Sequence, residues 1–309
     1  MKNAPPRPRR SVLYVPATNA KALAKIAALA CDVVIIDLED AVAPDAREQA
    51  REAMRSFVQQ AGRPACELVI RVNSLSGEWG TEDLLAAVAC RPDAILLPKV
   101  NGPRDILDAN DALDEMDADP ALALWAMIET PRGLLNLREI AELGRNPSAR
   151  LGCLVAGTND LLKETGIRPT PDRRYLQSWL AQIVLAARAG GLDALDGVSN
   201  DFRDLAAFAA ECAQGRDLGF DGKTLIHPAQ IEPANAAFSP GEAEIAEAQA
   251  IVAAFADPAN AEKGVIALGG RMVERLHLAQ AERLLAKAGA AAFNAGLQGI
   301  DFHGGVARK

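Results

Sequence analysis

Charged side chains stand at the ends of several short apolar runs of this chain, where parallel strands would gather them. The group contains five carboxylates, two cations and a histidine: Asp37, Glu39, Asp40, Glu129, Asp160, Arg71, Lys99 and His227. Carboxylates at this density repel one another, so some of them must be protonated, paired or bound to a cation. One bound divalent metal ion would offset the repulsion among these carboxylates.

Glu129 and Asp160 are the carboxylates best placed to hold this metal, because they follow consecutive predicted strands. Magnesium prefers few carboxylates and keeps positions open for water and substrate oxygens. A 2-oxo or 2-hydroxy acid could chelate there, with its carboxylate held by two parallel hydrogen bonds from Arg71. The metal would act as a Lewis acid on the oxygen at the bond that is broken or made.

The acidic residues also have a structural interpretation. Asp37, Glu39 and Asp40 could cap the helix that follows them, since acidic residues favour helix N-termini. Asp160 could be the N-cap of its own helix. Three acids in four residues exceed what one helix start needs, which favours the metal interpretation.

The basic residues have alternatives as well. Arg71 lies inside an apolar strand, where an unpaired guanidinium is costly, so it needs an anionic partner. Lys99 suits either a Schiff-base lysine or a salt-bridged anchor. His227 precedes a proline and fits a structural position in a loop.

The elements that must position these residues are short strands alternating with helical stretches. Eight strand-like runs occur, at 12–15, 33–37, 68–72, 94–98, 123–129, 151–155, 192–198 and 220–226. Continuous apolar runs, each followed by a helix, indicate a parallel sheet covered on both faces. Eight such units predict a (β/α)8 TIM barrel, whose catalytic groups lie at the C-terminal ends of the strands. A doubly wound open sheet is the competing fold, but the glycine-rich turn typical of it is absent after the first strand.

The pattern changes after the last of these strands. We expect two long helices, over 239–255 and 271–288, with no strand between them. The predicted organisation is therefore a disordered N-terminal tail over 1–10, a barrel over 11–235, and a C-terminal helical extension and tail over 236–309. This extension would pack on the barrel mouth or against a neighbouring subunit.

Composition limits the class of protein further. The 33 basic and 41 acidic residues give a net charge of -8, which argues against a nucleic-acid partner. The five cysteines are scattered without a CxxC pair, as expected of buried thiols in a reducing compartment. No signal peptide and no apolar stretch long enough for a membrane span is found. These features predict a cytoplasmic protein.

Seven segments together resemble the citrate lyase β-subunit-like family, within the HpcH/HpaI aldolase and citrate lyase group that includes malyl-CoA and citramalyl-CoA lyases. They are RSVLYVPA (10–17), DLEDAVAP (37–44), IRVN (70–73), LLPKV (96–100), MIETPRG (127–133), AGTNDL (156–161) and GFDGKTLIHPAQI (219–231). The resemblance implies a (β/α)8 barrel and Mg2+ on Glu129 and Asp160. It also implies that Arg71 binds the substrate carboxylate in a pocket lined by Pro16, Asp37 to Asp40, Ala156 and Gly157.

The C-terminal extension departs from this family at one position. Related acyl-CoA lyases place an aspartate there, which enters a neighbour's active site as acid/base on the thioester enolate. The corresponding segment, GGRMVERLHLAQAERLL (269–285), has Glu274 instead. Glutamate keeps the carboxylate but adds a methylene, which changes its reach.

The expected activity is a magnesium-dependent carbon–carbon cleavage of a 3-hydroxyacyl thioester such as citramalyl-CoA, malyl-CoA or a citryl thioester. The products would be a 2-oxo acid and an acetyl thioester, with Glu39, Asp40, Arg71 and Glu274 as catalytic candidates. The thioester could be on coenzyme A or on an acyl carrier protein, and we expect a homo-oligomer, a trimer or hexamer. The alternatives are a 2-oxo acid aldolase, a thioester hydrolase and a non-catalytic ligand-binding homologue.

Overall fold

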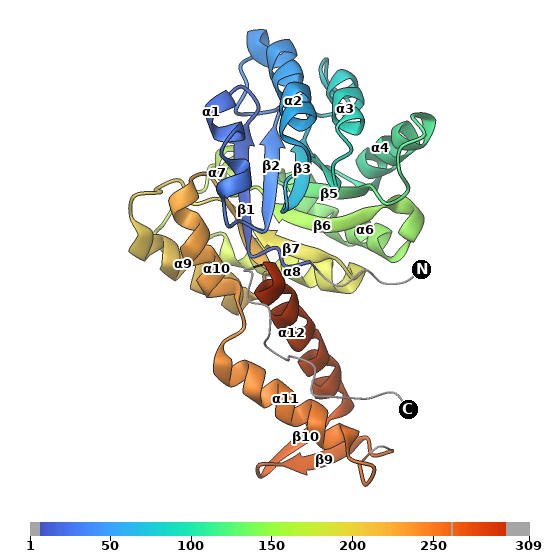
Figure 1. The fold of residues 1–309 in the computed structure, drawn as a ribbon, viewed down its shortest axis with the longest axis vertical. Helices are drawn as coiled ribbons and strands as arrows, with labels where there is room; N and C mark the ends of the chain where they lie inside the picture. Colours follow the sequence, from blue (N-terminus) through green and yellow to red (C-terminus); the bar gives the residue numbers. More distant parts are fainter. Residues whose placement is uncertain (1–6, 261, 295–309) are drawn as a thin grey trace. The chain divides into compact units, whose positions relative to one another are not determined.

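Eight parallel strands close into a barrel in the structure, a computed structural model that describes residues 7–260 and 262–294 (Figure 1). The strands are β1 Ser11–Pro16, β2 Val33–Asp37, β3 Glu67–Arg71, β4 Ala94–Leu97, β5 Ala123–Ile128, β6 Leu151–Ala156, β7 Asp193–Asp196 and β8 Gly222–Leu225. The barrel closes where Ser11 of β1 pairs with Lys223 of β8. The predicted (β/α)8 fold is confirmed, and the open-sheet alternative is wrong because both edge strands are paired.

Strands β1 to β6 are largely apolar on both faces, which is why these runs read as nearly continuous hydrophobic segments. Inward side chains fill the barrel interior, among them Val12, Val33, Ile35, Val69, Leu96, Trp125, Cys153 and Val155. Outward side chains pack beneath the helices in a second, larger core. The sheet is therefore anchored on both sides, and the loops after its strands are left to carry polar groups.

Helices cover the outside of the barrel between the strands. They are α1 Ala20–Leu23, α2 Arg47–Ala61, α3 Gly80–Ala89, α4 Pro103–Glu115, α5 Pro131–Leu135, α6 Leu137–Glu142, α7 Thr158–Thr165, α8 Gln177–Gly190, α9 Leu205–Leu218 and α10 Ile231–Phe238. Short 3-10 turns occupy Ile26–Ala28, Pro44–Ala46, Leu143–Arg145, Pro147–Ala149 and Pro228–Gln230. No helix among the described residues is long and apolar enough to cross a membrane.

The N-terminal ends of the strands are closed by Arg9. Its guanidinium bonds Glu67 through two nitrogens, at 2.8 and 2.7 Å, and Asp193 at 2.6 Å. It also lies 4.7 Å from the ring centroid of Trp125, inside the barrel. Arg10 makes a similar pair with Asp32. The expectation of a disordered tail through residue 10 is therefore wrong for these two arginines, because buried carboxylates hold them; residues 1–6 lie outside the described residues.

The described residues from Ser239 onward belong to a second compact unit. It contains α11 Glu242–Ala256, an antiparallel hairpin of β9 Val265–Leu268 and β10 Arg271–Glu274, and α12 Arg275–Asn294. The prediction of two helices with no strand between them is wrong, since Arg271–Glu274 is a strand. Gly269 and Gly270 adopt positive φ angles of 57° and 77°, as a two-residue hairpin turn requires. The predicted tail over 295–309 lies outside the described residues.

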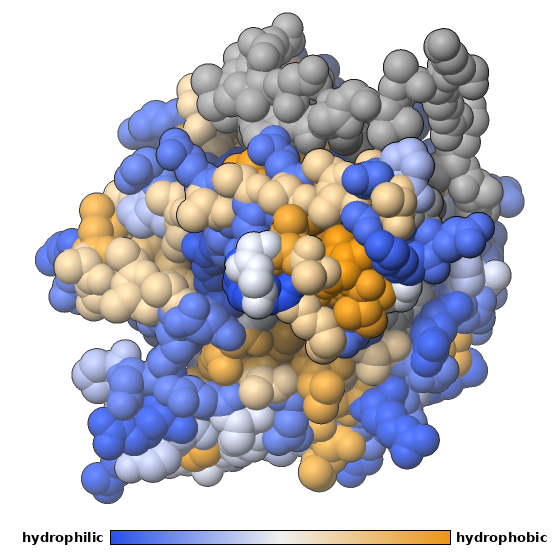
Figure 2. Space-filling view, turned by 90° about the horizontal axis from the view of Figure 1, so that it is seen from below, coloured by the Kyte–Doolittle hydropathy of each residue, from blue (hydrophilic) through white to orange (hydrophobic). Residues whose placement is uncertain are grey.

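Small apolar clusters hold this second unit together. Phe255 of α11 packs with Ile266 and Val273 of the hairpin, and α11 also packs on α12 through a second cluster. Met272 and Leu276 remain exposed. Figure 2, a view of the molecule from below, shows hydrophobic patches between hydrophilic residues on that face.

Candidate active site

A cavity of about 310 Å³ lies at the C-terminal ends of the barrel strands. Its wall includes eight of the residues that the sequence analysis selected: Pro16, Asp37, Asp40, Arg71, Glu129, Ala156, Gly157 and Asp160. Glu39 lies directly behind this wall and bonds two of the cationic groups. Glu274 belongs to the C-terminal unit, so its predicted catalytic role stays a prediction.

Arg71 is held in place by Asp37. Its Nε and Nη2 donate to the two carboxylate oxygens of Asp37 at 2.7 and 2.6 Å, so this side of the guanidinium is occupied. The remaining nitrogen, Nη1, lies 2.9 Å from Glu39 and 3.2 Å from Asp40. The side-on pair of donors expected for a substrate carboxylate is thus used within the protein, and a ligand would have to compete with Glu39 and Asp40 for Nη1.

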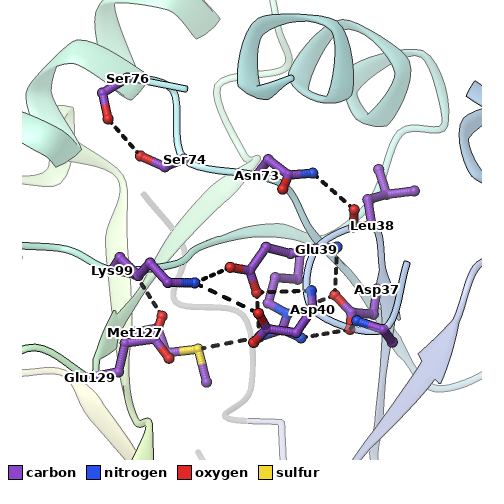
Figure 3. A network of polar contacts seen from close by, with 12 residues as sticks. Asp37, Leu38, Glu39, Asp40, Asn73, Ser74, Ser76, Lys99, Met127 and Glu129 are labelled. Carbon is purple, nitrogen blue, oxygen red and sulfur yellow. Dashed lines mark hydrogen bonds and ion pairs between the residues drawn. The ribbon is translucent and has the colours of Figure 1, made fainter. Parts of the chain in front are cut away.

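Glu39 and Asp40 form an acidic pair that contacts two cations, Arg71 and Lys99. Figure 3 shows the Lys99 side chain pointing toward both acids. It bonds Glu39, and its Nζ lies 3.8 Å from Asp40 Oδ1. Burial raises the pKa of Glu39 despite the nearby Arg71 and Lys99. Burial opposes ionisation of Asp40 too, but its hydrogen bond with Glu39 and the two cations outweigh burial and lower its pKa. The pair therefore holds a proton more readily on Glu39.

Lys99 also orients Glu129 through its backbone. The residue has a left-handed φ of 50°, a conformation that costs a side-chain-bearing residue energy and is found at functional sites. In this conformation its backbone N–H donates to Glu129 Oε1 at 2.7 Å. Of the two roles left open for Lys99, the ion-paired anchor describes what its side chain does here.

Glu129 is buried, with one carboxylate oxygen still available. Gly157 packs against it so closely that a Cβ there would lie 2.6 Å from Oε2. Burial, with smaller contributions from Glu39 and Asp160, raises the pKa of Glu129 to about 8, although Lys99 opposes this shift. A carboxyl in this environment favours protonation or a bound cation.

Asp160 faces the same cavity from the first turn of α7. The N-cap position of this helix is Gly157, so the interpretation of Asp160 as an N-cap is wrong. The residues at 37–40 do not cap α2 either, because α2 begins at Arg47 and Ala46 is its N-cap. Glu129 Oε2 and the Asp160 carboxylate fit a hard divalent cation, which prefers few carboxylates and open positions for oxygens.

Two polar residues from the same strand ends have structural roles instead. His227 accepts the backbone N–H of Ala229 on Nδ1 and stacks its ring on Phe202, with centroids 4.6 Å apart. Asp196 is fully buried and paired with Arg173 and Lys223. The strand-end position of His227 alone did not distinguish it from the residues of the cavity.

Tyr14, Met127 and Thr224 line the cavity and were not selected from the sequence. Met127 Sδ lies 3.9 Å from Arg71 Nη1, and the Tyr14 ring lies 5.0 Å from the Arg71 guanidinium. The alternation of side chains along a strand could have identified Tyr14. It precedes Pro16 by two positions on β1 and therefore points to the same side of the strand.

A (β/α)8 barrel that gathers four carboxylates and a buried arginine in one cavity, at the C-terminal ends of its strands, has the layout of a barrel enzyme. The chain belongs to the HpcH/HpaI aldolase/citrate lyase family, whose sequence model matches residues 10–228. The strand ends that carry the cavity all lie within this range.

Three relatives illustrate the similarity. A (3S)-malyl-CoA thioesterase of Cereibacter sphaeroides is 49% identical, over 93% of this chain and 98% of that protein. Citrate lyase subunit beta of Escherichia coli is 33% identical, over 91% and 94% of the two chains. The crystal structure of CitE from Mycobacterium tuberculosis with magnesium, acetoacetate and coenzyme A is 30% identical, with a TM-score of 0.70 over 92% of this chain and 98% of that one.

Proposed function

We propose that this protein is a magnesium-dependent enzyme that cleaves or forms a carbon–carbon bond in a 3-hydroxyacyl thioester. The substrate would be of the malyl-, citramalyl- or citryl-thioester type, and coenzyme A is the favoured carrier, with an acyl carrier protein as the alternative. The observation that carries the proposal is the cavity in which Arg71 lies beside Glu129 and Asp160. The magnesium and coenzyme A of the related CitE structure support it.

The residues of the cavity can perform the cleavage as follows. Nη1 of Arg71 binds the distal carboxylate, while Asp37 keeps the guanidinium in orientation. Asp40, which faces the cavity, takes the 3-hydroxyl proton and passes it to Glu39, the member of the pair that holds a proton more readily. The electrons of the broken carbon–carbon bond move to the thioester enolate, which an acid then protonates. Magnesium, held by Glu129 and Asp160, would supply Lewis-acid stabilisation of the charge that develops on oxygen.

Hydrolysis of the thioester is the second candidate, because the relative at 49% identity is a malyl-CoA thioesterase. The two reactions differ in the bond that breaks and therefore in their products. Cleavage of malyl-CoA gives glyoxylate and acetyl-CoA and releases no thiol. Hydrolysis gives malate and free coenzyme A, whose thiol reacts with a disulfide reagent.

We expect glyoxylate from malyl-CoA, or pyruvate from citramalyl-CoA, without stoichiometric thiol release. The measurement follows the 2-oxo acid and the thiol in parallel, with magnesium and with EDTA. Thiol without 2-oxo acid would establish the hydrolase instead. Cleavage of free malate or citramalate would indicate an aldolase, and binding without turnover a non-catalytic homologue.

We further propose that Glu274 protonates the enolate in the active site of a neighbouring subunit of a homo-oligomer, either a trimer or a hexamer. Glu274 ends β10 and directly precedes α12, and its carboxylate makes no ion pair among the described residues. Its backbone N–H donates to His277 Nδ1 at 2.9 Å, which fixes the backbone from which the carboxylate projects.

Mixing two inactive variants tests this arrangement. Glu274→Gln and Glu129→Ala should regain part of the activity after joint dissociation and reassembly, because some sites then contain both functional residues. Each variant reassembled alone is the control. If hybrids shown to have formed have no activity, Glu274 is not shared between subunits.

A further inference from the structure

Tyr14 lines the cavity, and its hydroxyl makes no hydrogen bond to another described residue. The residue points into the barrel from β1, packs on the interior core and lines the cavity. The guanidinium of Arg71 lies 5.0 Å from its ring centroid, a cation–π contact that needs only the ring. Phenylalanine would make the same packing contacts.

The hydroxyl oxygen is buried and has no hydrogen-bond partner among the described residues. Burial raises the pKa of Tyr14, so the phenol keeps its proton at neutral pH and acts as a donor. A buried polar group without a partner destabilises a protein, and such groups in folded proteins call for a specific explanation. In the ligand-free protein the hydroxyl is therefore unfavourable.

The charged neighbours of this phenol are already engaged. Arg71, Asp37, Glu39 and Glu129 act on it electrostatically, but Asp37 and Glu39 bond Arg71, and Glu129 Oε1 accepts the backbone N–H of Lys99. The ring is partly exposed at the cavity wall, while the oxygen is enclosed. A ligand beside Arg71 would therefore have to displace a side chain at this wall to reach the hydroxyl.

We propose that the Tyr14 hydroxyl donates a hydrogen bond to an oxygen of the 2-oxo acid half of the substrate, next to the carboxylate on Arg71. This inference rests on the proposed function, because it takes a 2-oxo acid as the ligand. It makes Tyr14 a substrate-binding residue, selective for ligands that present an acceptor oxygen at this position.

Tyr14→Phe tests the hydroxyl alone, since the ring and its contact with Arg71 are kept. With magnesium present, we expect pyruvate and glyoxylate to bind about two- to tenfold more weakly by calorimetry, as for one hydrogen bond to a carbonyl oxygen. The melting temperature of the ligand-free variant should equal or exceed that of the wild type. If the hydroxyl instead stabilised the fold, its removal would lower the melting temperature of the ligand-free variant.

Tyr175→Phe is the matched control, because the chain has two tyrosines and Tyr175 is exposed outside this cavity. This variant should bind both acids like the wild type. Tyr14 is the single tyrosine left in this variant. If tyrosine is labelled at the ring carbon that carries the hydroxyl, the NMR spectrum of Tyr175→Phe therefore contains one labelled tyrosine resonance, and pyruvate should shift it.

Three results overturn the inference: unchanged affinity in Tyr14→Phe, a lower melting temperature of that variant without ligand, or a Tyr14 resonance that ignores bound pyruvate. Failure of the proposed function looks different. In that case the wild type and both phenylalanine variants bind neither acid, and the substrate class itself is wrong, which removes the ligand that the inference requires.

Discussion

Glu129→Gln is expected to lower turnover with magnesium by about a thousandfold and to leave the barrel folded. Lewis-acid stabilisation contributes several kcal/mol, and about 4 kcal/mol corresponds to about a thousandfold in rate. Glutamine keeps the size of the side chain and an oxygen that can accept the Lys99 N–H. The measurement is turnover at saturating thioester, with circular dichroism to establish the fold. Asp160→Asn should act in the same direction.

The substitution should also change how stability depends on pH without metal. Burial raises the pKa of Glu129 from 4.5 to about 8, so between these values the folded state holds a proton that the unfolded chain has lost. The stability of the metal-free wild type therefore falls as pH rises through this window, by about 1.4 kcal/mol per pH unit at most. Glutamine has no such proton, so the variant's advantage in melting temperature should grow toward pH 8.

Glu164→Gln is the matched control, because Glu164 is an exposed glutamate on the helix that carries Asp160. This substitution should leave turnover and the pH dependence of the melting temperature as they are in the wild type. Magnesium should raise the melting temperature of the wild type and of this control, but not that of Glu129→Gln. An equal rise in all three would show that the metal binds elsewhere.

Arg71→Lys is expected to raise KM for the thioester by about ten- to a hundredfold, because an ammonium cannot replace the planar guanidinium. One lost charge-assisted hydrogen bond is worth about 1.5–3 kcal/mol. The variant also loses the two-point contact with the buried Asp37, so its melting temperature should fall as well. Steady-state kinetics and thermal unfolding measure the two effects.

Arg51→Lys separates binding from stability. Arg51 is likewise buried and pairs with the buried Asp83 at 3.0 Å, but it lies outside the cavity. It should lose stability with no change in KM. If Arg71→Lys behaves in the same way, then Arg71 serves only its ion pair with Asp37 and does not bind substrate.

The fold was readable from the sequence because parallel strands buried on both faces appear as uninterrupted apolar runs. The cavity followed from the same pattern, since residues after successive strands meet at one end of a barrel. Arg71, Glu129 and Asp160 came together for this reason, although their chemical roles stay predictions.

The hairpin over Val265–Glu274 was missed because each of its strands has four residues, too few for a periodic pattern. The pair of glycines between two apolar segments, Gly269 and Gly270, was the available signal. The helical pattern of the longer α12 was extended backward over β10 instead.

Two features of the site depend on backbone and side-chain geometry that no spacing encodes. One is the left-handed Lys99, whose N–H turns toward Glu129. The other is the pair of hydrogen bonds by which Nε and Nη2 of Arg71 bind Asp37. Sequence indicated that Arg71 needs an anionic partner, but the choice among neighbouring acids is made by tertiary packing.

The contact between Arg9 and Asp193 joins residues that are 184 positions apart in the chain. The barrel closes only when β1 pairs with β8, the last of its strands in the sequence. On the ribosome, the first strand is therefore made long before the partners that secure it. Until Gly222–Leu225 emerges, the growing sheet has two open edges, and open edges are where nascent chains aggregate. The residues that complete the barrel thus set how long the sheet keeps open edges during synthesis.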